Sequence, residues 1–296
     1  MKSSVPYMLF THGSTMFCDF SWGTLFIPMF FIPEIAGISA GPINYVMCPD
    51  CWLLLRAMCW LPFASLGLMT SSILTLFESR HQAIVSNSPY VMRRKWTRRV
   101  YYFTLHFCFI NLGIPELITM PDNQSEAKKE VLQNLPCISK DFFNEKSFVL
   151  QMDGFLFNSH MYLICAFVAT VTSYHVFHTF WHLLPRNNPS MSPATRKLQR
   201  NFFISMCIQI SIPLGLAYLP NLYWNMSISF RLYHQDFNNL SIVVLTSHAT
   251  MSSIATIFLY TPYRKYTLEL ILERILKIRK NASGTSTVVV SGANQN

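Results

Sequence analysis

The feature that most limits how this chain can fold is a series of nearly uncharged apolar segments, each of about 20 residues or more. A helix needs about that many apolar residues to cross a bilayer core of roughly 30 Å. Only 12% of the residues are charged, against roughly 25% in an average soluble domain, so a soluble fold would lack polar residues to cover its surface. The sequence therefore predicts an all-α membrane protein rather than a soluble enzyme.

Six segments are long and apolar enough to cross the bilayer, and we predict one helix in each. They are residues 7–38, 51–77, 100–120, 154–184, 202–224 and 240–260. The first is longer than a span requires and contains Pro28 and Pro33, which remove backbone donors. We therefore expect a kink or an early exit near its end.

Lys and Arg are concentrated in alternate connections, which sets the predicted orientation because cytoplasmic loops are rich in these residues. Basic clusters follow the second, fourth and sixth segments, whereas residues 41–50 contain no Lys or Arg and residues 225–239 contain only Arg231. Both termini are thus predicted inside the cell. The net charge of +9 is explained by these loops, and no separate basic domain is present to bind a nucleic acid.

Two further signals fit this orientation. Three N-glycosylation sequons fall on the predicted outer side, and we expect sugars at Asn123, Asn225 and Asn239. Leucine and isoleucine side chains in residues 264–280 gather on one helical face among basic residues, which predicts a helix lying on the inner leaflet. The transmembrane domain thus extends over residues 7–280, and residues 281–296 are predicted to be a disordered tail.

Several local patterns occur together along the chain. In order they are Asp19 with Pro28, Pro33 and Gly37; Glu78-Ser79-Arg80; Pro121-Asp122-Asn123-Gln124 leading to Leu135-Pro136-Cys137; Leu198-Gln199-Arg200-Asn201-Phe202-Phe203; and Thr261-Pro262-Tyr263-Arg264. In combination they resemble the nematode serpentine chemoreceptors of class H, relatives of classes I and Str. The resemblance covers nearly the whole chain.

That resemblance implies a G-protein-coupled chemosensory receptor in the plasma membrane of a sensory neuron. Such a receptor binds small environmental molecules and signals to a heterotrimeric G protein. The family has seven helices and an outside N-terminus, and residues from Tyr7 onward match its second helix, so we expect the first helix to be missing, through an incomplete sequence or a truncated receptor. A nonfunctional receptor fragment and a transporter or channel subunit remain the alternatives.

Ionisable residues in the predicted spans are candidate functional groups, because buried charges are costly. Asp19 lies near the middle of the first span and is predicted to join an activation or ion network, or else to bond a neighbouring helix. Glu34 and Arg56 lie near the outer surface and are candidate ligand contacts. The simpler interpretation of Arg56 is that it extends to lipid headgroups.

The family resemblance implies a switch at the cytoplasmic face. Glu78 and Arg80 match the acid–arginine element that holds the inactive state and contacts the G protein. Pro262, Tyr263 and Arg264 at the inner end of the last span belong to the same predicted coupling surface. Without the resemblance, Glu78 and Arg80 would be an ordinary helix-end pair of little energetic weight.

The outer cysteines predict a disulfide. Because the outside of the cell is oxidising, a bridge from Cys137 to Cys48 or to Cys51 would tether the long outer loop over the helix ends, and the resemblance implies the same bridge.

Metal and cofactor sites are not expected. Three histidines share one face of the fourth span but lack a carboxylate or further ligands, namely His175, His178 and His182. No phosphate-binding loop or dinucleotide fingerprint is present.

Overall fold

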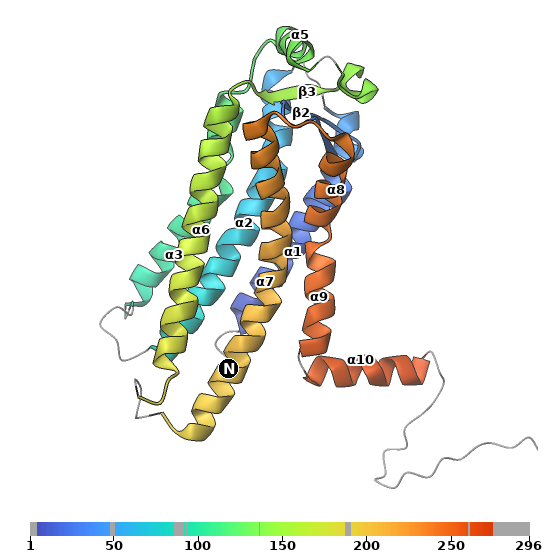
Figure 1. The fold of residues 1–296 in the computed structure, drawn as a ribbon. Helices are drawn as coiled ribbons and strands as arrows, with labels where there is room; N and C mark the ends of the chain where they lie inside the picture. Colours follow the sequence, from blue (N-terminus) through green and yellow to red (C-terminus); the bar gives the residue numbers. More distant parts are fainter. Residues whose placement is uncertain are drawn as a thin grey trace, which may run out of the picture. The chain divides into compact units, whose positions relative to one another are not determined.

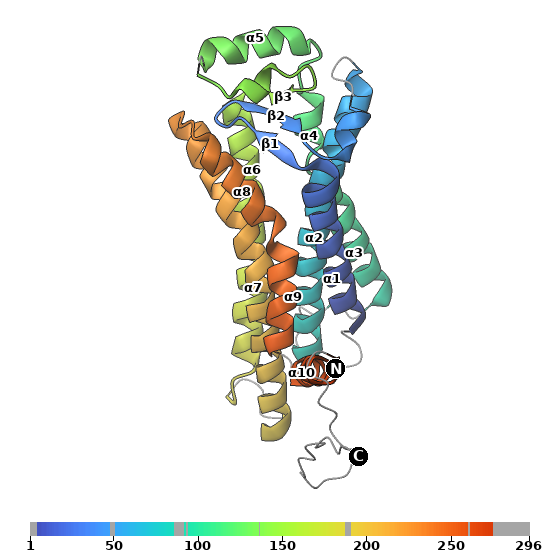
Figure 2. The same cartoon turned by 90° about the vertical axis from the view of Figure 1, so that its right-hand side faces the viewer.

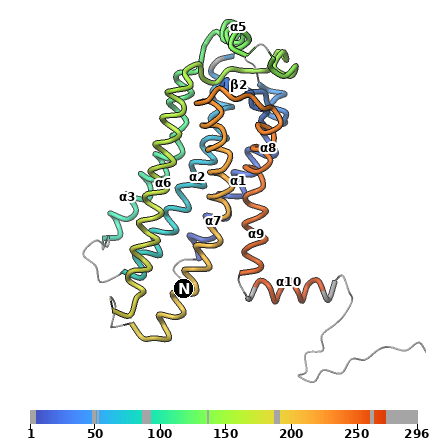
Figure 3. Tube along the Cα trace, viewed as in Figure 1, coloured from blue at the N-terminus to red at the C-terminus, as the bar shows by residue number. Residues whose placement is uncertain are grey.

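The computed structural model describes residues 5–47, 51–85, 92, 94–135, 137–186, 191–259 and 261–274. The chain divides into two compact units, Met1–Ser253 and Ile254–Asn296. Figures 1 and 3 trace the path of the chain through both.

The first unit is built mainly of helices, and α2 lies at its centre, packed against α1, α3 and α6 (Figure 1). The longer helices are α1 Val5–Phe20, α2 Trp52–Ile84, α3 Lys95–Ile110, α6 Gly154–His182, α7 Pro193–Phe230, α8 Gln235–Thr246 and α9 His248–Leu259, the last of which ends beyond the unit boundary. Shorter helical segments are η2 Ser21–Phe26, η3 Pro42–Tyr45, α4 Ile114–Ile118, α5 Gln124–Asn134 and η4 Lys140–Phe143.

Among the described residues, three helices are long and apolar enough to cross a membrane: Leu53–Ile84, Gly154–His182 and Pro193–Phe230. A fourth is added if α8 and α9, which meet at a bend of 43°, form one broken span. Helices α1 and α3 have 16 residues each, fewer than the roughly 20 that a straight span requires. The helical membrane class is confirmed, whereas the predicted count of six spans is not.

A three-stranded antiparallel sheet lies at one end of the first unit, beside α5 (Figure 2). Its strands are β1 Pro28–Phe30, β2 Ile35–Ser39 and β3 Phe148–Gln151, in the order β1-β2-β3. The helical segment before it ends at Ile27, whose φ of 42° is left-handed, and Pro28 then has no N–H to continue a helix. The predicted helix through residue 38 and the purely α-helical class are therefore wrong for residues 28–39, although the predicted early exit at the prolines is correct.

Aromatic side chains and one glycine fix how the helices meet beneath this sheet. Trp22 is buried, and its ring centroid lies 6.3 Å from that of Phe26 and 5.9 Å from that of Phe63. A Cβ atom at Gly67 of α2 would lie 1.9 Å from the backbone oxygen of Phe109 in α3. The close contact of α2 and α3 thus depends on the absence of a side chain at this position.

In the second unit, α10 runs over Thr261–Arg274. Its apolar residues Tyr266, Leu268 and Ile271 are exposed. That this helix lies on the inner leaflet stays a prediction. Residues 275–280 of the predicted surface helix and the predicted tail 281–296 lie outside the described residues.

Candidate functional site

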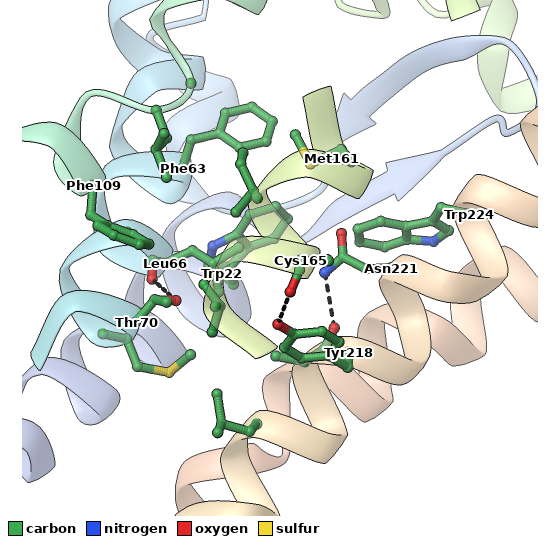
Figure 4. A pocket seen from close by; sticks show the side chains of 18 of the residues that line it. Trp22, Phe63, Leu66, Thr70, Phe109, Met161, Cys165, Tyr218, Asn221 and Trp224 are labelled. Atoms are coloured by element: carbon green, nitrogen blue, oxygen red, sulfur yellow. Dashed lines mark hydrogen bonds between the residues drawn. The ribbon is translucent and has the colours of Figure 1, made fainter. Parts of the chain in front are cut away.

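A cavity of about 100 Å³ lies between α2, α6 and α7, with η2 and the end of α3 completing its wall (Figure 4). We call it the aromatic cavity. Its aromatic lining residues are Trp22, Phe63, Phe109, Phe157, Tyr218 and Trp224. None of the described residues that line it is charged. Because burying a charge without a partner is very costly, this lining suits a neutral, largely apolar ligand.

The few polar groups of the aromatic cavity bond mostly to nearby main chain. The Tyr218 hydroxyl donates to the Cys165 carbonyl at 2.7 Å, and the Asn221 amide donates to the Ala217 carbonyl at 2.9 Å (Figure 4). These bonds fix the direction of both side chains. The Asn221 side-chain carbonyl oxygen is an acceptor that a ligand hydroxyl or amine can use.

A second, wider pocket of about 800 Å³ opens beside the sheet, and we call it the outer vestibule. The Arg231 guanidinium donates to the Glu34 carboxylate at 2.8 Å across it. Burial raises the pKa of Glu34 above its usual range, and the opposing charge of Arg231 reduces that rise. Asn158 also lines the vestibule, and its amide donates to Ser229 at 3.0 Å.

The structure separates the two predicted ligand contacts. Glu34 lines the outer vestibule, whereas Arg56 is not among the described residues that line either pocket. Arg56 instead donates to the Met120 carbonyl at 2.8 Å and to the Asp122 carboxylate at 2.9 Å. Arg231 is the partner that sequence reasoning missed, although it is the only Lys or Arg in residues 225–239.

Asp19 bonds the beginning of α9, the second helix of the bent pair α8 and α9. One carboxylate oxygen accepts from the Ala249 N–H at 3.1 Å, and the other lies 2.7 Å from Nδ1 of His248, which is buried. Both partners are in the first turn of α9, directly after the bend between α8 and α9. Asp19 thus bonds a neighbouring helix, as one of its two predicted roles required, and it does so at a point where the backbone direction changes.

Glu78 and Arg80 contact different helices at the far end of α2. The Glu78 carboxylate accepts from the Tyr102 hydroxyl of α3 and from the Gln82 amide. The Arg80 guanidinium lies over the Phe202 ring of α7, 3.9 Å from its centroid. Glu78 and Arg80 are only two positions apart in the sequence, yet Glu78 links α2 to α3 and Arg80 links α2 to α7.

The remaining predicted coupling residues lie in the second unit. Tyr263 is exposed, and the Arg264 guanidinium bonds the Phe258 carbonyl at 3.4 Å. The side chain of Pro262 lies outside the described residues.

The predicted modification sites differ in exposure. Asn123 caps α5 by accepting from the Glu126 N–H at 3.1 Å and is exposed, as is Asn239 in α8. Asn225 is only 3% exposed within α7, and its amide donates to the Asn221 carbonyl. Its burial leaves no room for a sugar in the folded protein, so the prediction of glycosylation at Asn225 is corrected.

The predicted disulfide concerns an exposed part of the chain. Cys137 and Cys51 are both exposed, and Cys48 lies outside the described residues. The bridge from Cys137 therefore stays a prediction.

A fourth histidine joins the three on α6. His81 of α2 places Nε2 2.6 Å from Nδ1 of His178, and its ring centroid lies 5.1 Å from that of His175. Within the described residues, no group of three or more His, Cys, Asp or Glu side chains is arranged to hold a metal ion.

Comparison with known families decides what kind of protein carries these sites. A family described as "Serpentine type 7TM GPCR chemoreceptor Srh" matches residues 1–273. The chain belongs to this family. This Srh protein is 25% identical over 199 residues to serpentine receptor class H-72 of Caenorhabditis elegans, a match that covers 66% of this chain and 56% of that relative.

The Srh family is a family of seven-transmembrane chemoreceptors, and this chain is a multi-pass membrane protein. No solved structure matches it significantly.

Proposed function

We propose that this Srh protein is a G-protein-coupled chemosensory receptor for small neutral molecules, which bind in the aromatic cavity. The uncharged aromatic lining carries this proposal, since it excludes an ionic anchor and offers apolar contact on every side. The family supplies the class of protein. The proposal includes a location in the plasma membrane of a sensory neuron.

The same helices connect the aromatic cavity to the opposite end of the bundle. Helix α2 carries Phe63 in the cavity wall and Arg80 near its end, and α7 carries Tyr218 in the wall and Phe202 beneath Arg80. Phe202 and Tyr218 are 16 positions apart in the sequence, which corresponds to about 24 Å of helix. A ligand that favours one packing of α2 on α7 would therefore change the contact of Arg80 with Phe202.

Pro213 interrupts the hydrogen-bond ladder of α7 between these two points. A proline kink gives the helix a place to bend when its outer part moves. The freed inner ends of α2 and α7, with Glu78 and Arg80, would then bind a heterotrimeric G protein. Tyr263 and Arg264 of the second unit stay predicted coupling residues.

The test is ligand-stimulated G-protein activation in cells, for this chain and for a version that carries an upstream helix from a class H relative. We expect the extended version to respond to members of a neutral odorant panel and Asp19→Ala to abolish that response while surface expression is kept, since α9 loses its cap. If Asp19→Ala signals normally, Asp19 has only a structural role. If neither version couples despite surface expression, the receptor proposal fails, and ion or solute flux becomes the next measurement.

A further inference from the structure

A groove of about 400 Å³ lies where the end of α6 meets the beginning of α7, at the end of the bundle opposite the sheet. We call it the inner groove. Its apolar wall includes Phe177, Trp181 and Leu184 of the α6 side, and Arg196 and Arg200 of α7 complete it. Positive charge in the adjoining loop predicts that this end faces the cytoplasm.

The apolar wall of the inner groove is open. Phe177 is 73% exposed and Trp181 is 60% exposed, whereas Phe180 between them packs on Phe203 with ring centroids 5.1 Å apart. Such large exposed side chains at the end of a membrane-crossing helix are suited to contact lipid chains, and tryptophan favours the level of the headgroups. The wall therefore offers a surface for acyl chains below a polar rim.

The rim is strongly basic. Arg196 and Arg200 are four residues apart on α7, so they lie on the same face, one turn from each other. Arg196 donates to the Met191 carbonyl at 3.1 Å and lines the groove together with Arg200. The sequence contains no Asp or Glu between Asp153 and Asp236, so neither α6 nor α7 supplies a carboxylate to neutralise this charge.

We propose that the inner groove binds a phospholipid with an anionic headgroup from the inner leaflet. Guanidinium groups bind phosphate through paired hydrogen bonds, and basic pockets between transmembrane helices on the cytoplasmic side suit anionic headgroups. The acyl chains lie against Phe177 and Trp181, and the phosphate lies between Arg196 and Arg200. The lipid bridges α6 to α7 and goes beyond the proposed chemosensory function, since it requires neither an odorant nor a G protein.

The test uses Trp181 as a reporter inside the groove. The full chain is placed in phosphatidylcholine nanodiscs that contain either dibrominated phosphatidylserine or dibrominated phosphatidylcholine, because bromine quenches tryptophan on contact. The Trp181 signal is the difference between wild type and Trp181→Phe. We expect phosphatidylserine to quench this signal at much lower mole fraction than phosphatidylcholine.

Charge variants separate a built site from general attraction. Arg196→Gln with Arg200→Gln should lower the apparent affinity for phosphatidylserine about tenfold or more, since each cationic side chain contributes severalfold at an anionic surface. The matched control Lys197→Gln removes one positive charge from the same region of α7, as Arg200→Gln alone does. Lys197 is not among the groove's described lining residues, so this variant should change affinity less than twofold. Arg196→Lys with Arg200→Lys keeps both charges but loses the paired hydrogen bonds of the guanidinium groups, so its affinity should lie between those of wild type and of the double glutamine variant.

Three results would overturn the proposal. Equal quenching by both brominated lipids would mean that the groove only contacts bulk lipid. An equal loss in Lys197→Gln would mean that the charge acts from a distance. Removal of the preference by soluble glycerophosphoserine would mean that the arginines bind a free anion rather than a membrane lipid. If the double glutamine variant does not fold, Arg200→Gln alone gives the same comparison, because Arg200 is exposed.

Discussion

The aromatic cavity and the outer vestibule are neighbours with opposite chemistry. Two adjacent residues of α6 line different pockets: Phe157 lines the cavity and Asn158 lines the vestibule. The cavity holds about 100 Å³ and no described charged residue, whereas the vestibule holds about 800 Å³ and the ion pair of Glu34 with Arg231. A small neutral molecule gains most by burial in the cavity, while the vestibule is too wide and too polar to enclose it.

The largest expected effect concerns the tight helix contact that shapes the aromatic cavity. Gly67→Ala would place a methyl group 1.9 Å from the Phe109 oxygen, so α2 and α3 must separate. We expect more than a tenfold loss of folded protein at the cell surface. Gly215→Ala on α7 is the matched control, because its Cβ would meet nothing within 4 Å, and it should express at the wild-type level or slightly above. Normal surface expression and thermal stability of Gly67→Ala would contradict this packing.

Filling each pocket in turn tests which of them binds the ligand. Ala217→Phe adds a ring to a wall of the aromatic cavity and should reduce ligand potency by tenfold or more in the G-protein assay, with surface expression kept. Ser159→Phe adds a similar ring to the outer vestibule, where most of the volume remains, and should change potency less than about twofold. The reverse ranking would assign ligand binding to the vestibule.

A smaller effect is expected from removing one hydrogen-bond acceptor of the aromatic cavity. Asn221→Leu removes a side-chain carbonyl that can accept from a ligand. Alcohols should lose about threefold to tenfold in potency, the range of one net hydrogen bond, while hydrocarbons of equal size should lose none. Dose–response curves for matched pairs of compounds measure this, and an equal loss for both compounds would indicate a change of shape rather than of polarity.

The smallest effect belongs to the outer vestibule. The pKa of Glu34 is raised in the folded protein, so between its usual range and that raised pKa the folded state binds more protons than the unfolded state. The contribution of Glu34 to stability therefore falls as pH rises through this window. Unfolding temperatures of purified protein between pH 4.5 and 7 should show this fall in wild type and a weaker one in Glu34→Gln. Identical profiles would mean that the Glu34 carboxylate does not contribute to the pH dependence of stability.

The sequence predicted the parts of this molecule that depend on local pattern. Nearly uncharged apolar segments identified the helices later seen as α2, α6 and α7, and ordered motifs identified the family. Residues 28–39 were missed because β2 is buried along almost its whole length, so it lacks the alternation that marks a half-exposed strand.

The candidate sites were harder to predict because their partners are far apart along the chain. Glu34 meets Arg231 across 197 residues, and no local pattern specifies such a contact. The aromatic cavity is lined by the same tryptophan, phenylalanine and leucine side chains that fill any helical core. Only the spacing of α2, α6 and α7 distinguishes a cavity wall from ordinary packing.

The sheet also dictates an order of assembly during synthesis. Strand β2 ends at Ser39, and its partner β3 begins only at Phe148. The ribosome must therefore add about 110 residues before β3 can pair with the hairpin of β1 and β2. At cellular elongation rates this takes on the order of ten seconds. Gln235 and Asn238, which bond the Phe30 and Ile32 carbonyls, emerge later still. Until then the nascent chain presents an unpaired strand edge, and such an edge is a template for chaperones or for aggregation.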